Sequence, residues 1–437
     1  MAELPGGATG VGLVGLGTIG AGTVRILLEH GGLIRERLGG SLELVRIADL
    51  DLDTDRGIDI SSFECSSDWR DVIEDPRVEL VVELVGGTGV AREIVIAALE
   101  AGKGVVTANK ALLAHHGAEI YEIATRCGVE IGFEASVGGT IPVLRSLREG
   151  LCADRLEQVF GILNGTCNYI LSEMDEQAEP YEACLKRAQD LGYAEADPSF
   201  DVNGTDSAHK LAILCGLAFG VQIGPDEIAT EGIEKISAVD IDYARRFGLQ
   251  IKLLAIAKRS DAGLEARVHP TLLPRESMLA RTGGAMNAVE VRGQKSGSTV
   301  YYGAGAGADP TASAVVADLM ELARSRKSGG VRVPPLGTPT LRALPLRRLE
   351  DLEGEFYLRF DALDRPGVLA HLAGALGDRE IGIASLLQVE EGGSEAVPVV
   401  LLTHPVKEAA LRAALAEVAR LGEFRSTPQL LRIEREL

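Results

Sequence analysis

The stretch from Val11 to His30 restricts the fold more than any other part of the sequence. A short apolar strand, Val11 to Val14, runs into the loop GLGTIG, and a helical segment, TVRILLEH, follows. In such a unit the first glycine permits a tight turn, the second lets the backbone approach a pyrophosphate, and the third lets the helix pack on the strand. The helix N-terminus then faces the phosphates. This predicts a dinucleotide-binding unit whose cofactor contacts are Gly15, Gly17, Thr18, Ile19 and Gly20.

Strands and helices continue to alternate after this loop. The strand LELVRIADL is followed by the buried run VELVVELVGG, the helix VAREIVIAALEAG and the strand GVVTANK. This alternation predicts an α/β fold with a Rossmann-type, doubly wound parallel sheet. Gly87 and Thr88 lie at the carboxyl end of one of these strands, where open sheets bind ligands, and are predicted to contact the cofactor.

Asp49 at the end of the second strand indicates which dinucleotide binds. An acidic side chain at this place accepts hydrogen bonds from the ribose hydroxyls of the adenosine. It favours NAD, because a carboxylate repels the 2′-phosphate of NADP. Arg56 is close enough in sequence to bind that phosphate, so NADP stays open as the alternative.

The length and charge of the chain limit its partners. With 437 residues, it is long enough for two or three domains. The formal net charge of −20 argues against nucleic acid and anionic membranes, which require clustered Lys and Arg. The six cysteines are scattered, and the N-terminus shows no secretory signal. These features predict a cytoplasmic protein that acts on a small molecule.

The stretch from Gly192 to Lys210, GYAEADPSFDVNGTDSAHK, is the strongest candidate for a reactive site. It gathers four carboxylates and one lysine between two helical segments. A helix is predicted to begin near Thr205, and on it Asp206 and Lys210 are four residues apart and share one face. An exposed pair of this kind would be only a solvated surface feature. The next turn is almost purely apolar, so we expect a desolvated lysine held by a carboxylate, which is a candidate proton donor.

Two other features each have two interpretations. Lys110 directly follows the strand GVVTANK at the ligand-binding edge of the sheet, but an ordinary surface lysine explains its position equally well. The glycine-rich loop from Gly303 to Gly307 runs into the helix ASAVVADLMELAR and could place Gly307 over the cofactor. A crowded crossing between domains is the alternative.

The segment from Asn164 to Asn168 is predicted to be a turn, with a helix after it.

The pattern also predicts domain boundaries. Residues 1–135, with a returning segment at about 303–330, are expected to form the dinucleotide-binding domain, and residues 136–302 an α+β catalytic and dimerisation domain. A Pro- and Gly-rich stretch at residues 331–350 is a predicted linker. The remainder, residues 351–437, has the pattern βαββαβ and is expected to be a separate small domain.

The whole chain resembles the homoserine dehydrogenases of the monofunctional form, with a C-terminal ACT domain. The resemblance rests on GLGTIG, VTANKALLA, EASVGGTIP, GILNGTCNYIL, GYAEADPSFDVNGTDSAHK and DRPGVLA, in that order. It implies reversible NAD(P)-dependent interconversion of L-homoserine and L-aspartate 4-semialdehyde, in the biosynthesis of threonine, methionine and isoleucine. It also implies a homodimer or homotetramer.

The resemblance further implies roles for individual residues. Lys210, Lys110 and Asp206 would be catalytic, and Lys110 and Gly192 would also contact the cofactor. The implied substrate-binding residues are Glu195, Asp201, Asp206, Thr166, Gly165 and Tyr193. A monovalent cation, usually sodium, would be held by Glu134 and by the backbone carbonyls of Val137, Gly139 and Ile141.

The C-terminal domain is expected to bind an amino-acid effector, L-threonine. The loop from Asp364 to Gly367 precedes a helix and offers backbone donors for a carboxylate at the helix N-terminus. A pure dimerisation module is the alternative, because a βαββαβ fold does not by itself define a ligand.

Two other functions fit parts of the pattern. An aspartate-semialdehyde dehydrogenase requires a nucleophilic cysteine with a partner histidine. Cys167 lies in a suitable segment, but the histidine of the site region, His209, falls off the face shared by Asp206 and Lys210. A non-catalytic sensor of dinucleotide and amino acid would use the same domains without turnover. The two lysines and the acidic cluster argue against a sensor.

Overall fold

The computed structural model describes residues 7–329, 333–338, 341, 344–388 and 395–436. These residues form two compact units. The first combines Met1–Gly165, Asp206–Ile228 and Met286–Leu344, and the second combines Thr166–Thr205, Ala229–Ala285 and Pro345–Leu437. Each unit is therefore assembled from segments that are far apart in the sequence.

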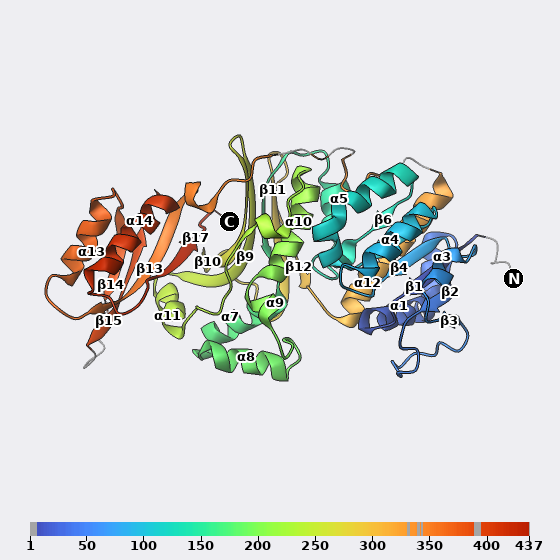
Figure 1. The fold of residues 1–437 in the computed structure, drawn as a ribbon, viewed down its shortest axis with the longest axis horizontal. Coiled ribbons are helices and arrows are strands. Elements are labelled where there is room, and N and C mark those ends of the chain that lie inside the picture. Colours follow the sequence, from blue (N-terminus) through green and yellow to red (C-terminus); the bar gives the residue numbers. More distant parts are fainter. Residues whose placement is uncertain (1–6, 330–332, 339–340, 342–343, 389–394, 437) are drawn as a thin grey trace. The chain divides into compact units, whose positions relative to one another are not determined.

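The first unit contains a parallel six-stranded sheet (Figure 1). Its strands are β1 Ala8–Val14, β2 Ser41–Ala48, β3 Glu64–Ser66, β4 Leu80–Glu83, β5 Gly104–Thr107 and β6 Ile131–Gly132. They lie in the order β3-β2-β1-β4-β5-β6, and each neighbouring pair is parallel. The order reverses between β1 and β4, so the carboxyl ends of these strands form the switch point at which such sheets bind ligands. The predicted doubly wound sheet is confirmed.

Helices cover both faces of this sheet. They are α1 Thr18–Glu29, α2 Gly31–Leu38, α3 Arg70–Glu74, α4 Val90–Glu100, α5 Lys110–Cys127 and α12 Ala308–Ser328. Helices α1 and α12 pack side by side over one face, although they are distant in sequence. Gly22 permits this close approach, because a Cβ there would lie 3.1 Å from the Cβ of Ala312. Their apolar residues join Val11, Ile47 and Leu80 of the sheet in one buried core.

The first unit also contains an antiparallel group of three strands and the helix α10. The remaining elements are η1 Glu134–Ser136, α6 Val143–Arg145, the π-helical turn η2 Ser146–Gly150, β7 Leu156–Ile162, α10 Thr205–Phe219, η3 Pro225–Glu227, β11 Met286–Gly293 and β12 Gly297–Ala304. Strand β11 pairs with β7 on one side and β12 on the other. Helix α10 is buried along almost its whole length, as the apolar sequence after Lys210 predicts.

The second unit is built around a sheet of long strands. Its elements up to the linker are α7 Gly165–Gln177, α8 Tyr181–Asp190, α9 Ser199–Val202, β8 Ala229–Thr230, α11 Ala238–Arg246, β9 Leu249–Ser260 and β10 Gly263–Pro274. Strands β9 and β10 form an antiparallel hairpin, and β8 adds a short parallel pairing to β10.

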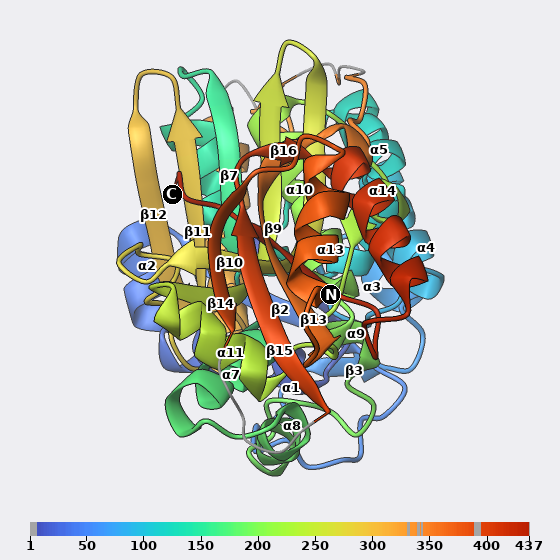
Figure 2. The same cartoon turned by 90° about the vertical axis from the view of Figure 1, so that its left-hand side faces the viewer.

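The C-terminal part of this unit has the predicted βαββαβ order. Its elements are η4 Leu349–Asp351, β13 Glu353–Leu363, α13 Val368–Gly377, β14 Ile383–Gln388, β15 Ala396–Thr403, β16 Val406–Lys407, α14 Glu408–Val418, η5 Ala419–Leu421 and β17 Gln429–Ile433. Helices α13 and α14 lie together against one face of β13 and β15 (Figures 1 and 2). Alternate residues of these strands, among them Phe356, Leu358 and Phe360, form the core with the helices.

The C-terminal fold differs from the expectation of a separate domain, because it shares a sheet with the preceding strands. Strand β17 pairs in parallel with β10, placing Arg432 opposite Thr271, and in antiparallel with β13. The pattern of one segment shows that it is a strand but not which partner it pairs with. Residues 331–332, 339–340 and 342–343 of the predicted linker lie outside the described residues.

The predicted turn from Asn164 to Asn168 is wrong in its bounds, because α7 begins at Gly165. Thr166 and Asn168 carry short polar side chains that often compete for local backbone groups. Here they are engaged elsewhere in the second unit: Thr166 donates to the carbonyl of Tyr193, and Asn168 donates to the carbonyl of Thr282.

Among the described residues, no helix has both the length and the apolar composition for a membrane crossing.

Candidate functional site

The start of helix α10 carries the predicted pair of Asp206 and Lys210. Asn203 accepts a hydrogen bond from the backbone of Thr205 at 2.9 Å, and the helix begins there. Asp206 and Lys210 are 2% and 8% exposed, and their Oδ2 and Nζ atoms are 2.7 Å apart. Lys210 also donates to the carbonyl of Leu163 at 2.6 Å. The pair is therefore a buried ion pair, as the apolar sequence around it predicts.

Lys110 reaches the same carboxylate from helix α5. Its Nζ lies 3.0 Å from Oδ1 of Asp206, while its side chain keeps 36% exposure. Asn109 caps α5 by accepting from the backbone of Leu112 at 3.0 Å, which fixes the helix start that carries the lysine. Lys110 therefore belongs to the same charge cluster as Asp206 and Lys210.

Asp206 is thus the centre of a buried cluster of charge. Its two oxygens face two ammonium groups, and the amide of Asn164 donates to Oδ2 at 3.0 Å. Burial alone would raise the pKa of Asp206, but Lys210 and then Lys110 lower it well below its ordinary value. The carboxylate is therefore ionised and holds both ammonium groups together. Such a cluster can give a proton to, or take one from, an oxygen of a bound ligand.

Asn164 was not singled out as a partner of Asp206 from the sequence. The signal available was its place just after the strand that precedes α7, but nothing local connects it to α10.

The alternative of a nucleophilic cysteine loses support, because the buried Cys167 donates to the carbonyl of Asp201 at 3.2 Å. His209 packs edge-on against His115 with ring centroids 5.0 Å apart, and burial lowers its pKa.

The glycine-rich loop after β1 has the geometry of a phosphate-binding turn. Gly15 has φ +100°, and a Cβ there would lie 2.6 Å from the backbone of Leu84. A Cβ at Gly20 would lie 2.1 Å from the carbonyl oxygen of Gly15, so this glycine is required for helix packing. At Gly17 a Cβ would meet open space, so the packing of the protein does not by itself require glycine there. A ligand approaching the backbone would require it. Thr18 and Ile19 open the helix α1 at this loop.

Asp49 follows the last residue of β2 and lies beside this loop. Its carboxylate accepts from the backbone of Leu16 and, at 2.8 Å, from the backbone of Asp51. Arg56 is turned toward Asp51, with 3.1 Å between Nη2 and Oδ2, and toward the carbonyl of Thr54 at 2.9 Å. Asp51 therefore holds Arg56, the residue that would bind a 2′-phosphate.

The loop after β4 carries Gly87 and Thr88 and is braced by a buried acid. The carbonyl of Gly87 accepts from the amide of Asn109 at 2.7 Å, which links this loop to the start of α5. Glu83 is fully buried. Its carboxylate accepts hydrogen bonds from the hydroxyl of Thr107 at 2.7 Å and from the backbone of Val85 at 2.9 Å. Burial raises its pKa. Sequence reasoning missed Glu83, although an acid at the end of an apolar strand is itself a signal.

The predicted substrate residues of the second unit form a small cluster of their own. The hydroxyl of Thr166 donates to the carbonyl of Tyr193 and lies 3.5 Å from Oδ2 of Asp201. Tyr193 is 47% exposed and packs against the ring of Tyr169. Glu195 is exposed in the same loop as Gly192, which has φ +76°. The structure brings Thr166, Tyr193 and Asp201 together; Gly165 is the first residue of α7.

The residues predicted for a cation lie in the first unit. Both carboxylate oxygens of Glu134 accept backbone hydrogen bonds from the start of α6, from Leu144 at 2.8 Å and Arg145 at 2.7 Å. Burial, with the nearby Asp318, raises the pKa of Glu134 to about 7. Glu134 itself donates its backbone N–H to Asp318 at 2.8 Å. Two buried acids therefore lie together. Arg145 binds Asp318 at 3.1 Å, and Arg145 and Arg148 only partly oppose the burial that raises the pKa of Asp318.

A hard monovalent cation fits this environment. Carboxylate and carbonyl oxygens are the ligands such ions prefer, and added positive charge would relieve the two buried acids. Gly138 and Gly139 have φ +75° and +58°, which curls the loop of Val137, Gly139 and Ile141. The carbonyl of Ile141 also accepts from Val143 at 2.8 Å. Among the described residues, no three His, Cys, Asp or Glu side chains are grouped to hold a metal ion, so the predicted cation would rely on one carboxylate and backbone carbonyls.

Gly307 caps α12 with φ +126°, and a Cβ there would lie 3.3 Å from Pro310. Its conformation is therefore explained by the helix start.

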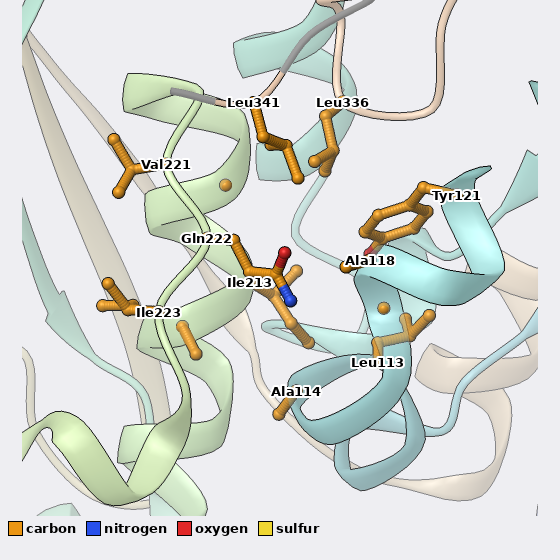
Figure 3. A pocket seen from close by; sticks show the side chains of 13 residues that line it. Leu113, Ala114, Ala118, Tyr121, Ile213, Val221, Gln222, Ile223, Leu336 and Leu341 are labelled. Atoms are coloured by element: carbon orange, nitrogen blue, oxygen red, sulfur yellow. The ribbon is translucent and has the colours of Figure 1, made fainter. Parts of the chain in front are cut away.

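A small cavity lies elsewhere in the first unit, between the helices that carry the two lysines (Figure 3). Apolar residues of α5 and α10, among them Leu113 and Ile213, face each other there beside Gln222 (Figure 3). Its volume of about 30 Å³ holds no more than roughly two water molecules. The apolar side chains around it pack the two helices together, and the cavity is too small for a substrate.

Comparison with known proteins decides the family. The homoserine dehydrogenase of Pseudomonas aeruginosa is 45% identical to this chain over 413 residues, which cover 94% of the chain and 95% of that protein. The chain belongs to the homoserine dehydrogenase family. Three family profiles agree: the NAD binding domain of homoserine dehydrogenase matches residues 15–134, homoserine dehydrogenase residues 142–320, and the ACT domain residues 356–423.

Solved structures of homoserine dehydrogenases have the same fold. One from Thiobacillus denitrificans is 44% identical, with a TM-score of 0.93 and coverage of 98% of both chains. One from S. aureus is 28% identical, with a TM-score of 0.79 over 98% of this chain. The predicted resemblance, fold class and enzyme class are therefore confirmed. The chain has an NAD(P)-binding domain and the activity of an NAD(P)-dependent homoserine dehydrogenase.

Proposed function

We propose that Lys210 and Lys110 are the catalytic lysines in the interconversion of L-homoserine and L-aspartate 4-semialdehyde. The observation that carries the proposal is the single buried carboxylate of Asp206, which lies 2.7 Å from one ammonium group and 3.0 Å from the other. A carboxylate in this position orients both lysines and keeps them close despite their mutual repulsion. Asn164 fixes the carboxylate in turn.

The chemistry requires one hydride and one proton to leave homoserine. Oxidation takes a hydride from the carbon that bears the side-chain hydroxyl and a proton from that hydroxyl. Bound NAD(P) supplies the acceptor for the hydride. A lysine amine accepts the proton, and in the reverse direction its ammonium group returns a proton to the oxygen of the aldehyde. Lys210 has 10% side-chain exposure and Lys110 has 36%. We therefore place the proton transfer on Lys210 and substrate and cofactor contact on Lys110.

The amino-acid end of the substrate requires acids for its ammonium group and donors for its carboxylate. Asp201 lies beside the hydroxyl of Thr166, and Glu195 is exposed in the loop that follows Tyr193. We assign the ammonium group of homoserine to Asp201 and Glu195. Asp206 is less suited to this task, because two lysines already neutralise its charge.

We propose NAD as the preferred cofactor. Asp49 lies next to the phosphate-binding loop, and its carboxylate would repel a 2′-phosphate. Arg56, which could attract that phosphate, is engaged by Asp51 and by a backbone carbonyl. These two observations support the same preference.

A sodium ion and an amino-acid effector complete the proposal. Glu134 and the carbonyls of Val137, Gly139 and Ile141 would hold the sodium ion, because they supply only oxygen ligands beside two buried acids. L-Threonine would bind in a cavity of about 330 Å³ that is lined by the loop from Asp364 to Gly367 and the start of α13. We also propose a homodimer, as the smallest assembly in which ACT domains pair.

The test of the catalytic proposal is the formation of NAD(P)H from NAD(P) and homoserine, followed by absorbance. Lys210→Met should reduce kcat at least about 100-fold, the usual contribution of a general acid or base. The cofactor should still bind, as measured by NADH fluorescence. Lys186→Met is the matched control, because Lys186 forms an i,i+4 pair with Asp190 but is 68% exposed. A Lys210→Met variant with more than a tenth of the original kcat would contradict the assignment.

A further inference from the structure

Arg432, near the end of the chain, is the centre of a buried ionic cluster in the second unit. It lies on β17, and its side chain is 4% exposed. Its guanidinium binds Glu231 through Nη1 at 3.0 Å and Nη2 at 2.9 Å. It binds Glu408 of α14 through Nε at 2.8 Å and Nη2 at 2.7 Å. Arg412 approaches the same two carboxylates, at 2.5 Å from Glu408 and 3.7 Å from Glu231.

The forked geometry makes this arginine a rigid connection. Two carboxylates each accept two parallel donors, which fixes their orientation as well as their distance. Glu408 is 1% exposed and belongs to the C-terminal fold, whereas Glu231 belongs to the segment that follows β8. The pKa of Glu231 is lowered, because the hydrogen bonds from Arg432 outweigh the effect of burial. The cluster therefore attaches the segment that follows β8 to the C-terminal fold.

The segment after β8 supports the residues that follow Asp201. Ile233 donates its backbone N–H to the carbonyl of Val202 at 2.9 Å. A Cβ at Gly232 would lie 2.4 Å from that carbonyl, and a Cβ at Gly204 would lie 2.8 Å from the side chain of Thr230. The two stretches, residues 202–204 and 230–233, are therefore in backbone contact. A displacement of one must move the other.

The same segment is held by the C-terminal fold at a second point. Asp240, in the first turn of α11, is fully buried and accepts from the hydroxyl of Tyr357 at 3.0 Å and from Nε of Arg359 at 2.8 Å. Both donors lie on β13. The stretch from Glu231 to Asp240 is thus fixed at both ends by side chains of the C-terminal strands.

We propose that Arg432 is a positioning residue of the homoserine site: through Glu231 it fixes the segment on which residues 202–204 rest, and so the carboxylate of Asp201. The inference rests on the proposed function, because it requires Asp201 to bind the substrate. It gives the last strand of the chain a part in substrate affinity, beyond any effector that the C-terminal domain binds. Because Arg432 contacts neither lysine, and its cluster reaches the site through the segment that carries Asp201, we expect it to affect the KM for homoserine more than kcat.

Glu231→Gln is the most informative variant. It keeps the shape of the side chain and leaves the buried pair of Arg432 and Glu408 intact. We expect the KM for homoserine to rise roughly three- to tenfold, as a small displacement of a binding group does, with kcat and the KM for NAD(P) within about twofold of the original. Glu355→Gln is the matched control. This variant breaks another ion pair of the C-terminal fold, in which Glu355 of β13 lies 2.6 Å from Arg435, a residue that follows β17. The pair does not touch residues 230–233.

A double-mutant cycle separates positioning from general loss of structure. Asp201→Asn should itself raise the KM for homoserine, and adding Glu231→Gln should then raise it by less than about twofold more, because coupled residues are not additive. An equal further rise on both backgrounds would overturn the positioning role, and so would an unchanged KM in Glu231→Gln alone. No effect of Asp201→Asn would instead overturn the substrate assignment of Asp201. If Glu231→Gln does not fold, Arg432→Lys makes the test from the other side of the pair, because lysine keeps the charge and loses the fork.

Discussion

Replacing Lys252 with methionine tests how the protein accommodates a buried charge near the start of α7. Lys252 lies on β9 and is fully buried. Its ammonium group donates to the carbonyl of Thr282 at 2.6 Å, to the side-chain oxygen of Asn168 at 2.9 Å and to Ser172 at 3.4 Å. These partners are all neutral, and Asn168 stands in the first turn of the helix that carries Thr166.

The magnitude follows from the pKa of this lysine. Burial lowers the pKa of Lys252 to about 8, and the nearby Asp175 only partly opposes the effect. In an unfolded chain the pKa is about 10.4, and a difference of one between the two values corresponds to about 1.4 kcal/mol. Below about pH 8 the lysine is charged in both states, so the folded state bears the full cost of about 3 kcal/mol. As the pH rises from about 8 to about 10.4, the folded lysine loses its proton first and the cost disappears.

The measurement is the free energy of unfolding in urea, for the unmodified protein and for Lys252→Met, at several pH values. The variant lacks the hydrogen bonds of Lys252, and its own stability does not depend on the titration of this lysine. The stability of the unmodified protein relative to the variant should rise by about 2 kcal/mol between about pH 7 and pH 9.5. A difference that stays constant over this range would refute the reasoning, because it would show that the folded state does not perturb Lys252. Lys186→Met, at an exposed position, is the control.

Three further predictions concern ligands. Asp49→Ala should raise kcat/KM with NADP relative to NAD by roughly tenfold or more, because it removes the charge that repels a 2′-phosphate; an unchanged ratio would place the choice on Arg56 or a neighbour. Replacing sodium with choline should lower the thermal stability of the unmodified protein, but not that of Glu134→Gln, and equal responses in differential scanning fluorimetry would argue against a cation at Glu134. Millimolar threonine should inhibit the full-length protein, and Arg365→Ala, in the loop that lines the C-terminal cavity, should weaken the inhibition several-fold. If calorimetry detects no heat of threonine binding, the domain has only a structural role.

Local patterns in the sequence were sufficient to predict the elements of the fold and half of the lysine site. The glycine loop, the parallel sheet and the pair of Asp206 and Lys210 all depend on residues close together in the chain. The approach of Lys110 to Asp206 depends on the packing of α5 and α10, so position alone left it undecided. Asn164 and Glu83 were missed for the same reason, since their roles are set by partners on other strands and helices.

The C-terminal fold shows the same limit on a larger scale. Its βαββαβ order follows from alternation and turn residues, and the structure confirms it. The pairing of β17 with β10 and the ion pairs of Arg432 are long-range, and a polar residue such as Arg432 in a strand looks solvent-exposed when only its neighbours are considered. The sequence therefore predicted a domain that is separate, whereas its last strand belongs to the central sheet of the second unit.

The pairing of β17 with β10 has a consequence for biosynthesis of the protein on the ribosome. Strand β10, Gly263–Pro274, is made long before its neighbour β17, Gln429–Ile433, because the two strands are far apart in the sequence. Until β17 has been made, the edge of β10 beyond its short pairing with β8 carries unpaired backbone groups, and such an edge invites pairing with other nascent chains. A premature stop or a proteolytic cut that removes β17 would leave this edge open permanently. We therefore expect the nascent chain to need chaperones most in the interval between the synthesis of β10 and that of β17.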